Sequence, residues 1–99
     1  MSQFKILLVS ATNMEVHSLI DKTKEPISSD FYFSIFPDTQ ILISGIGVEF
    51  TIFNLTKHLS VYQYDIVVNI GICGSYNRSF SLGLATEVFD DCFADQMVE

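Results

Sequence analysis

Three short apolar runs, each followed by a loop of small or glycine residues, restrict the fold of this chain more than any other feature. They cover residues 4–9, 40–44 and 64–70 and have the Ile, Leu and Val content of buried strands. Helix-length segments at residues 13–23 and 48–59 separate them. Strands that alternate with helices pair in parallel through right-handed crossovers. The sequence therefore predicts the α/β class, with a mixed, largely parallel sheet flanked by helices.

The two predicted helices differ in how many apolar faces they carry. In the first, at residues 13–23, apolar side chains recur at helical spacing and Pro26 follows as a stop signal. In the second, at residues 48–59, Phe50 and Phe53 lie off the main stripe, so this helix is expected to bury a second face as well. Its main stripe, predicted to face the sheet, consists of Val48, Ile52, Leu55 and Leu59.

Two further strands complete the predicted order of elements. Residues 31–36 are rich in aromatic side chains and are predicted to form a hairpin with residues 40–44 through a turn at 37–39. Residues 86–92 are predicted to start another strand. A chain of 99 residues has room for one core, so residues 1–99 are expected to form a single domain.

Charge and hydropathy argue against several classes of partner. The net charge is −7, with 5 basic side chains and no basic run, which argues against nucleic acid and against an anionic membrane surface. No apolar stretch approaches the ~20 residues of a membrane span, and the N-terminus lacks a signal-peptide layout. Cys73 and Cys92 lack metal-type spacing, so reduced thiols in the cytoplasm are expected.

The apolar content of the sequence indicates that part of the protein surface is covered by other protein. Hydrophobic residues make up 48% of the sequence, and the mean hydropathy of +0.35 is high for so short a water-soluble domain. A partner chain or a missing part of the same fold is expected to cover the excess apolar surface.

The predicted ligand site lies in three loops, at residues 11–15, 45–47 and 71–74, which follow the three apolar strands. In an open α/β sheet, ligands gather at the carboxyl ends of the strands. Glu15 has two interpretations. Thr12 and Glu15 have the spacing of a capping box, which the pattern alone favours. Alternatively, the Glu15 carboxylate is a general base at the mouth of the first strand.

Other chemistry-bearing residues carry weaker signals. The Gly45-Ile46-Gly47 turn lacks a third glycine at the fingerprint spacing, which favours a tight strand-to-helix turn over a phosphate site. His17 and His58 are predicted on helix faces, without a second ligand nearby, so no metal site is expected. Cys73 has no base tied to it and is predicted to be a small buried residue. Arg78 is expected to tie down its own loop.

Taken together, the motifs resemble the purine nucleoside phosphorylase and nucleosidase superfamily. The resemblance follows the order and spacing of motifs along nearly the whole chain, which makes it more specific than any single piece. The motifs are Glu-Val at 15–16 opening the first helix, Ser-Gly-Ile-Gly at 44–47, Asp-(apolar)₃-Asn-x-Gly-x-x-Gly at 65–74, and Leu-Gly at 82–83.

Within that superfamily, the chain is most similar to the futalosine hydrolases of menaquinone biosynthesis. The similarity is carried by Gly-Ile-Cys-Gly-Ser-Tyr-Asn-Arg-Ser at 71–79 and by residues 87–95. Methylthioadenosine/S-adenosylhomocysteine nucleosidases usually carry Gly-Ser-Ala-Gly-Gly in the central loop, from which Ile72 and Ser75 depart. The phosphorylases use basic residues around the first two loops. None stands there in this chain, which favours water as the nucleophile.

The resemblance implies roles for individual residues in hydrolysis of the N-glycosidic bond of a purine nucleoside. Glu15 matches the carboxylate that positions and deprotonates the attacking water. The matching substrate positions are Ala11, Thr12 and Ile46 near the ribose and its 5′ substituent, and Ile72, Cys73 and Gly74 beside the ribose and base. The resemblance implies no cofactor and no metal, because protonation activates the leaving purine.

The resemblance also implies that a second half of the fold is needed. Members of the family are about twice as long, and their ribose-binding glutamate and purine-protonating aspartate have no match in this chain. The sequence is therefore expected to be an N-terminal half, and a homodimer is expected, as in the family. A non-catalytic α/β fragment and a methylthioadenosine/S-adenosylhomocysteine nucleosidase stay as alternatives.

Overall fold

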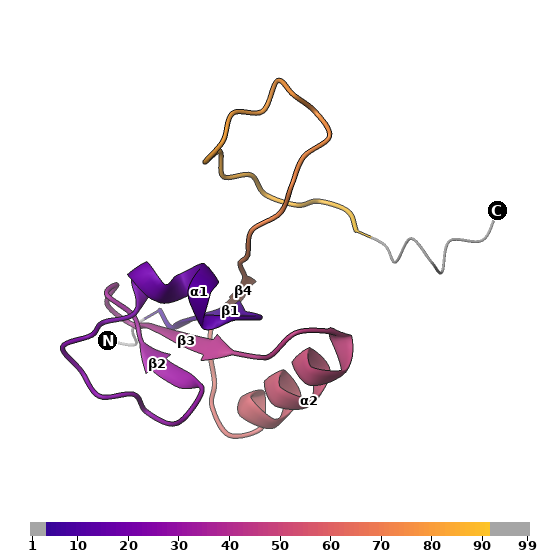
Figure 1. Cartoon of the computed structure of the whole chain (residues 1–99). Helices are drawn as coiled ribbons and strands as arrows, with labels where there is room; N and C mark the ends of the chain where they lie inside the picture. The colour runs from indigo at the N-terminus through magenta and orange to yellow at the C-terminus, as the bar shows by residue number, and fades with distance from the viewer. Residues whose placement is uncertain (1–3, 92–99) are drawn as a thin grey trace.

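The computed structural model describes residues 4–91, which form a four-stranded sheet with two α-helices (Figure 1). The sheet order is β2-β3-β1-β4. This arrangement confirms the predicted α/β class and the mixed, largely parallel sheet. The elements are β1 (Ile6–Ser10), α1 (Asn13–Val16), a 3-10 turn (His17–Leu19), β2 (Phe31–Phe33), β3 (Thr39–Ile43), α2 (Val48–Leu59) and β4 (Ile66–Asn69).

The strand register lines up the carboxyl ends of the parallel strands. The central strand β1 pairs in parallel with β3 on one side and with β4 on the other, so that Ser10 lies opposite Ile43 and Val9 opposite Asn69. The predicted hairpin is confirmed, because β2 pairs antiparallel with β3. The loops that follow β1, β3 and β4 therefore start at one edge of the sheet.

The core is small and is formed by side chains from β1, β2 and β3. Leu7 and Val9 of β1 pack with Phe31 of β2 and Leu42 of β3, and all four are at most 6% exposed. Partly buried Ile27, Leu55 and Tyr64 pack against this cluster. The apolar runs at 4–9 and 40–44 thus supply the core, as their composition predicts.

The first helix is much shorter than predicted. It ends at Val16, a 3-10 turn follows, and Ile20 is already extended and bridges to Ser34. The backbone N–H of Asp21 then donates to the Phe33 carbonyl, and its carboxylate accepts from the Thr23 hydroxyl and N–H. The predicted helix over 13–23 is therefore wrong, because these residues find partners on β2 and in a local Asp turn.

Helix α2 has the predicted bounds but packs on a different face. Of the predicted stripe, Val48, Ile52 and Leu59 are 45%, 61% and 39% exposed, and only Leu55 packs against the core. The face toward the sheet is instead largely polar: Thr51, Asn54 and Leu55 are half-buried and His58 is buried. Side-chain hydrogen bonds select this face, since Asn54 Nδ2 donates to the Ser44 carbonyl at 2.7 Å.

Strand β4 forms where predicted but is exposed rather than buried. Ile66, Val67 and Val68 are between 37% and 43% exposed, because β4 is an edge strand and contacts β1 alone among the described strands. Residues 86–91 form no strand, and Cys92 lies outside the described residues. Figure 1 shows the chain leading away from the sheet after β4, so residues 86–91 have no strand to pair with.

An aromatic and polar cluster ties α2 to the sheet. His58 packs edge-on against Phe31, with ring centroids 4.4 Å apart, and stacks on Tyr62 and Tyr64. The Tyr64 hydroxyl donates to Gln40 Oε1 at 2.8 Å, so that its oxygen is left to accept a hydrogen bond from His58 Nε2, also at 2.8 Å. Burial lowers the pKa of His58 and raises the pKa of Tyr64 to about 12.

The lowered pKa of His58 predicts that acid destabilises the fold before the carboxylates titrate. Below the ordinary histidine value of 6.5, the unfolded chain takes up a proton that the folded chain resists, so the free energy of unfolding falls as pH falls. We expect urea midpoints to decrease between about pH 8 and about pH 5.5, where Asp and Glu stay ionised. The variant His58→Gln should lose this component and His17→Gln should keep it. An equal pH response in both variants would contradict the assignment.

Neither described helix combines the length and hydropathy that a membrane span requires; this holds for residues 4–91.

Candidate functional site

The carboxyl edge of the sheet brings the first and third predicted site loops together beside the start of the second. The Ser44 N–H donates to the Ser10 carbonyl at 2.8 Å, and the Ile70 N–H donates to the Val9 carbonyl at 2.9 Å. The first bond joins the ends of β1 and β3, and the second joins the ends of β1 and β4. The loops at 11–15, 45–47 and 71–74 therefore begin side by side, as parallel pairing predicts.

Glu15 is the residue that links two of these loops. Its Oε1 accepts a hydrogen bond from the Thr12 hydroxyl at 2.8 Å, and its Oε2 accepts one from the Ile72 backbone N–H at 3.0 Å. Ile72 is 57 residues away in sequence, beyond the end of β4. One carboxylate thus fixes the loop after β1 against the loop after β4.

The geometry around Glu15 agrees in part with a capping box and in part with a carboxylate available for chemistry. Thr12 occupies the N-cap position of α1, with an extended backbone at φ −133° and ψ 155°, but its side chain makes no capping hydrogen bond. Its hydroxyl donates to the Glu15 carboxylate instead. The capping position is therefore as the pattern predicts, while the Thr12 side chain serves the carboxylate rather than the helix.

The hydrogen bonds hold Glu15 in its ionised form. The Ile72 N–H contributes most to lowering the pKa of Glu15, followed by the Thr12 hydroxyl, and these outweigh a small opposing effect of burial. At neutral pH the side chain is a half-buried carboxylate with further acceptor capacity on each oxygen. Such a group can accept a hydrogen bond from a water or a hydroxyl and fix its orientation.

Gly71 makes the close contact between Glu15 and the third loop possible. A Cβ atom at position 71 would lie 2.7 Å from Glu15 Oε2, which is too close for a real contact. The oxygen sits there because it accepts the hydrogen bond from the next residue, Ile72. A side chain at position 71 must therefore displace the carboxylate.

We expect Gly71→Ala to separate Glu15 from the Ile72 N–H and to raise the pKa of Glu15 toward its ordinary value of 4.5. An NMR titration of the Glu15 side-chain carboxyl carbon measures this change. Gly74→Ala is the matched control, because nothing lies within 4 Å of a Cβ at position 74. If Gly71→Ala and Gly74→Ala gave the same Glu15 titration curve, the contact would not control the carboxylate.

The other predicted site residues lie on the same loops but differ in exposure. Ala11 and Thr12 are half-buried, whereas Ile46 and Ile72 are 72% and 84% exposed. The prediction of a buried Cys73 is wrong: its thiol is free and exposed, because the chain leaves the sheet after β4. Gly74 is exposed as well.

The Gly45-Ile46-Gly47 segment is the tight turn from β3 into α2. Both glycines have positive φ, at +90° and +100°, a backbone region that residues with a side chain rarely adopt. At Gly45 a Cβ would also lie 3.1 Å from the Cβ of Phe50. The two glycines are thus needed for the turn itself.

A buried polar network beneath the first two loops was not anticipated from the sequence. The Ser44 hydroxyl lies within hydrogen-bond distance of the Ser10 carbonyl and of the Thr51 hydroxyl, and Asn54 binds the Ser44 carbonyl. Ser10 and Ser44 are 0% and 2% exposed. The available signal was the serine at the end of the first two apolar runs, Ser10 and Ser44, which marks the points where these strands give way to loops.

The described residues contain no group of three His, Cys, Asp or Glu side chains that could hold a metal ion. Two cavities, of about 400 and 330 Å³, are lined by none of the predicted site residues. Glu15 therefore lies at the carboxyl ends of the parallel strands and outside both of these cavities.

Comparisons of the chain with protein-family models, with curated proteins and with solved structures gave no significant match.

Proposed function

We propose that this chain is part of a purine nucleosidase that hydrolyses the N-glycosidic bond of futalosine and releases hypoxanthine, in the cytoplasm. One observation carries the proposal: an ionised carboxylate, Glu15, is held by Thr12 and the Ile72 N–H at the carboxyl edge of a largely parallel sheet. This is the edge at which α/β folds bind ligands. The choice of substrate rests on the resemblance of the loop at 71–79.

In this proposal the chain supplies the N-terminal half of a nucleoside phosphorylase-like fold. The strand order β2-β3-β1-β4 leaves the apolar strand β4 exposed on both faces at one side of the sheet. Such a strand is stabilised when further elements pair with it or cover it. A carboxyl-terminal half of the kind found in the family would supply these elements.

The proposed reaction uses Glu15 to orient water for attack on the anomeric carbon. The bond from the anomeric carbon to the purine nitrogen breaks first, and its electron pair leaves with the purine. The water oxygen then forms the new bond to that carbon. Glu15 accepts a hydrogen bond from the water and takes its proton as the oxygen adds. A lowered pKa makes Glu15 a weak base, which suits a reaction in which the sugar acquires oxocarbenium character before water adds.

The remaining roles follow from the loops and from the resemblance. Ala11, Thr12 and Ile46 would border the ribose and its 5′ substituent, and Ile72, Cys73 and Gly74 would run beside the ribose and base. Protonation of the purine needs an acid on the opposite side of the scissile bond. The resemblance assigns that acid to the carboxyl-terminal half, so the 99-residue chain is expected to bind nucleoside without measurable turnover.

An NMR titration of the labelled chain tests the proposal. Futalosine, methylthioadenosine and, as a control, a pyrimidine nucleoside would be added separately while the backbone amides are followed. We expect futalosine to shift the amide signals of Thr12, Glu15 and Ile72 in a saturable way, and the pyrimidine nucleoside to leave them unchanged. If no purine nucleoside shifted these signals at millimolar concentration, the proposal would fail. Tighter binding of methylthioadenosine would favour the alternative nucleosidase.

We also propose that the protein self-associates as a homodimer through α2. Phe50 and Phe53 are 61% and 66% exposed, and Ile52 between them is 61% exposed. Phe50 and Phe53 are three residues apart and therefore neighbours on the helix surface, and exposed apolar surface of this kind usually marks an interface. Sedimentation at micromolar concentration should show a dimer, and Phe53→Ser should shift it toward monomer, while Glu49→Gln on the same helix should not. A monodisperse wild-type monomer would contradict this prediction.

A further inference from the structure

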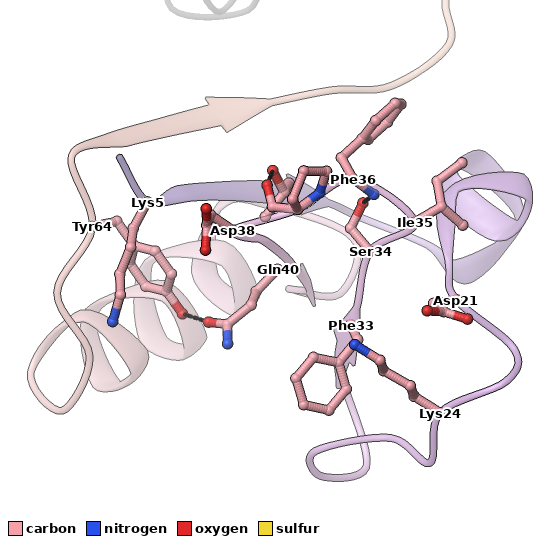
Figure 2. Close-up of a pocket in the computed structure, with 12 residues that line it drawn as sticks. Lys5, Asp21, Lys24, Phe33, Ser34, Ile35, Phe36, Asp38, Gln40 and Tyr64 are labelled. Atoms are coloured by element: carbon pink, nitrogen blue, oxygen red, sulfur yellow. Dashed lines mark hydrogen bonds between the residues drawn. The ribbon is translucent and has the colours of Figure 1, made fainter. Parts of the chain in front are cut away.

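A second candidate site lies at the opposite edge of the sheet from Glu15. A cavity of about 400 Å³ opens where the parallel strands begin, and it is lined by residues that precede or start them, among them Lys5, Asp38 and Tyr64 (Figure 2). Glu15 follows the carboxyl end of β1, whereas this cavity lies at its amino end. A volume in this range is typical of a site for a small molecule.

Two aromatic rings and a side-chain amide, from Phe33, Tyr64 and Gln40, are part of the lining of this cavity. Phe33 on β2 is the register partner of Gln40 on β3, and the Tyr64 hydroxyl donates to Gln40 Oε1 at 2.8 Å. Figure 2 shows the Phe33 and Tyr64 rings extending to the same side of the sheet, with the Gln40 amide between them. Tyr64 stacks on His58 behind it, which holds the ring in place.

Hydrogen-bond donors without acceptors are also part of the lining of this cavity. Because Gln40 Oε1 is used by Tyr64, its amide nitrogen is left with two N–H donors that have no acceptor among residues 4–91. The Lys5 ammonium likewise has no acceptor in the described part of the chain. The Lys24 ammonium lies 5.0 Å from the centroid of the Phe33 ring.

This cavity holds a large share of the few basic side chains of the protein. The chain has only 5 Lys and Arg side chains against 12 Asp and Glu, and two of these basic side chains line the cavity. An ammonium group next to an aromatic wall favours a ligand with a negative charge at the edge of a planar apolar body. The aromatic side chains of Phe33 and Tyr64 in the lining favour the same planar body.

We propose that this cavity binds a small aromatic carboxylate, whose ring lies between Phe33 and Tyr64 and whose carboxylate accepts hydrogen bonds from Lys5 and the Gln40 amide. Two aspartates also line the cavity and set the limit on affinity. The Asp21 carboxylate accepts hydrogen bonds from the N–H and the hydroxyl of Thr23. The Asp38 carboxylate accepts no side-chain hydrogen bond from residues 4–91, so its charge opposes an anion. Removing the charge of Asp38 should therefore tighten binding, an effect opposite to that of removing Lys5.

The test uses 2-naphthoate as the probe and the neutral 2-naphthamide as its matched control, with the 99-residue chain. NMR titrations follow the Gln40 side-chain amide and the Phe33 and Tyr64 ring signals. We expect naphthoate to shift these signals saturably and to bind more tightly than naphthamide. Lys5→Gln should weaken naphthoate binding by about two- to fivefold, and Asp38→Asn should strengthen it by a similar factor.

Lys22→Gln is the matched control for Lys5→Gln, because Lys22 contacts His17 outside the cavity and should leave binding unchanged. Equal affinity for naphthoate and naphthamide would overturn the proposal. So would shifts confined to residues outside the cavity, or weaker naphthoate binding by Asp38→Asn. The result of the naphthoate titration is independent of the result of the nucleoside titration. The two titrations use different ligands, and the residues that report on them lie at opposite ends of the parallel strands.

Discussion

Replacing Glu15 with Gln is expected to lower base release by about 10²–10⁴-fold in a protein that joins this chain to the carboxyl-terminal half of a futalosine hydrolase. The carboxylate is the group proposed to orient and deprotonate the water, and an amide of the same shape cannot take the proton. Release of hypoxanthine, followed by chromatography, measures the loss. Glu49→Gln, at the exposed start of α2, is the control and should retain activity.

The same substitution should leave the fold intact. A glutamine at position 15 can still accept the Ile72 N–H through its oxygen, and its amide nitrogen can donate to the Thr12 hydroxyl, which accepts as well as donates. We therefore expect the urea midpoint of the chain to change little. Near wild-type turnover by the Glu15→Gln protein would contradict the role of Glu15 as a base and leave it only a structural role, linking two loops.

Leu7→Ala is expected to destabilise the chain by about 2–5 kcal/mol. Leu7 lies on the central strand β1, is 0% exposed and belongs to the core cluster with Phe31 and Leu42. A loss of this size is a large fraction of the ~5–15 kcal/mol that stabilises a typical domain, so much of the variant should be unfolded at 37 °C. Urea unfolding followed by circular dichroism measures the change.

Leu82→Ala is the control for this measurement, because the same side chain is removed from a position that is 104% exposed. Its effect should stay within about 0.5 kcal/mol. Equal destabilisation by the two variants would mean that the sheet does not carry the stability of the chain.

The largest departures from the sequence-based predictions occur where polar contacts compete with apolar periodicity. In α2 the stripe of Val48, Ile52 and Leu59 predicted the wrong face. The reason is that Asn54 and His58 find hydrogen-bond partners in Ser44, just after β3, and in Tyr64, just before β4. Periodicity ranks side chains by hydropathy alone. It contains no information on whether a buried carbonyl such as that of Ser44 needs a donor.

The length of the first helix could not be predicted for a related reason. The apolar spacing continues through Leu19 and Ile20, but Ile20 pairs with Ser34 and Asp21 donates to Phe33. The competing partner lies more than ten residues away and becomes available only when β2 has been placed. Local pattern therefore overestimated the helix, and a tertiary contact ended it.

The sequence by itself determined the α/β class, the central strands and the positions of the three loops, because apolar runs and glycine turns act locally on the backbone. It also singled out Glu15 and Thr12 as a pair through their spacing. Only the tertiary structure decided that the Glu15 carboxylate binds the Ile72 N–H, that Gly71 leaves room for it, and that β4 is exposed. Each of these depends on segments distant in sequence that meet only once β1 and β4 have paired in register.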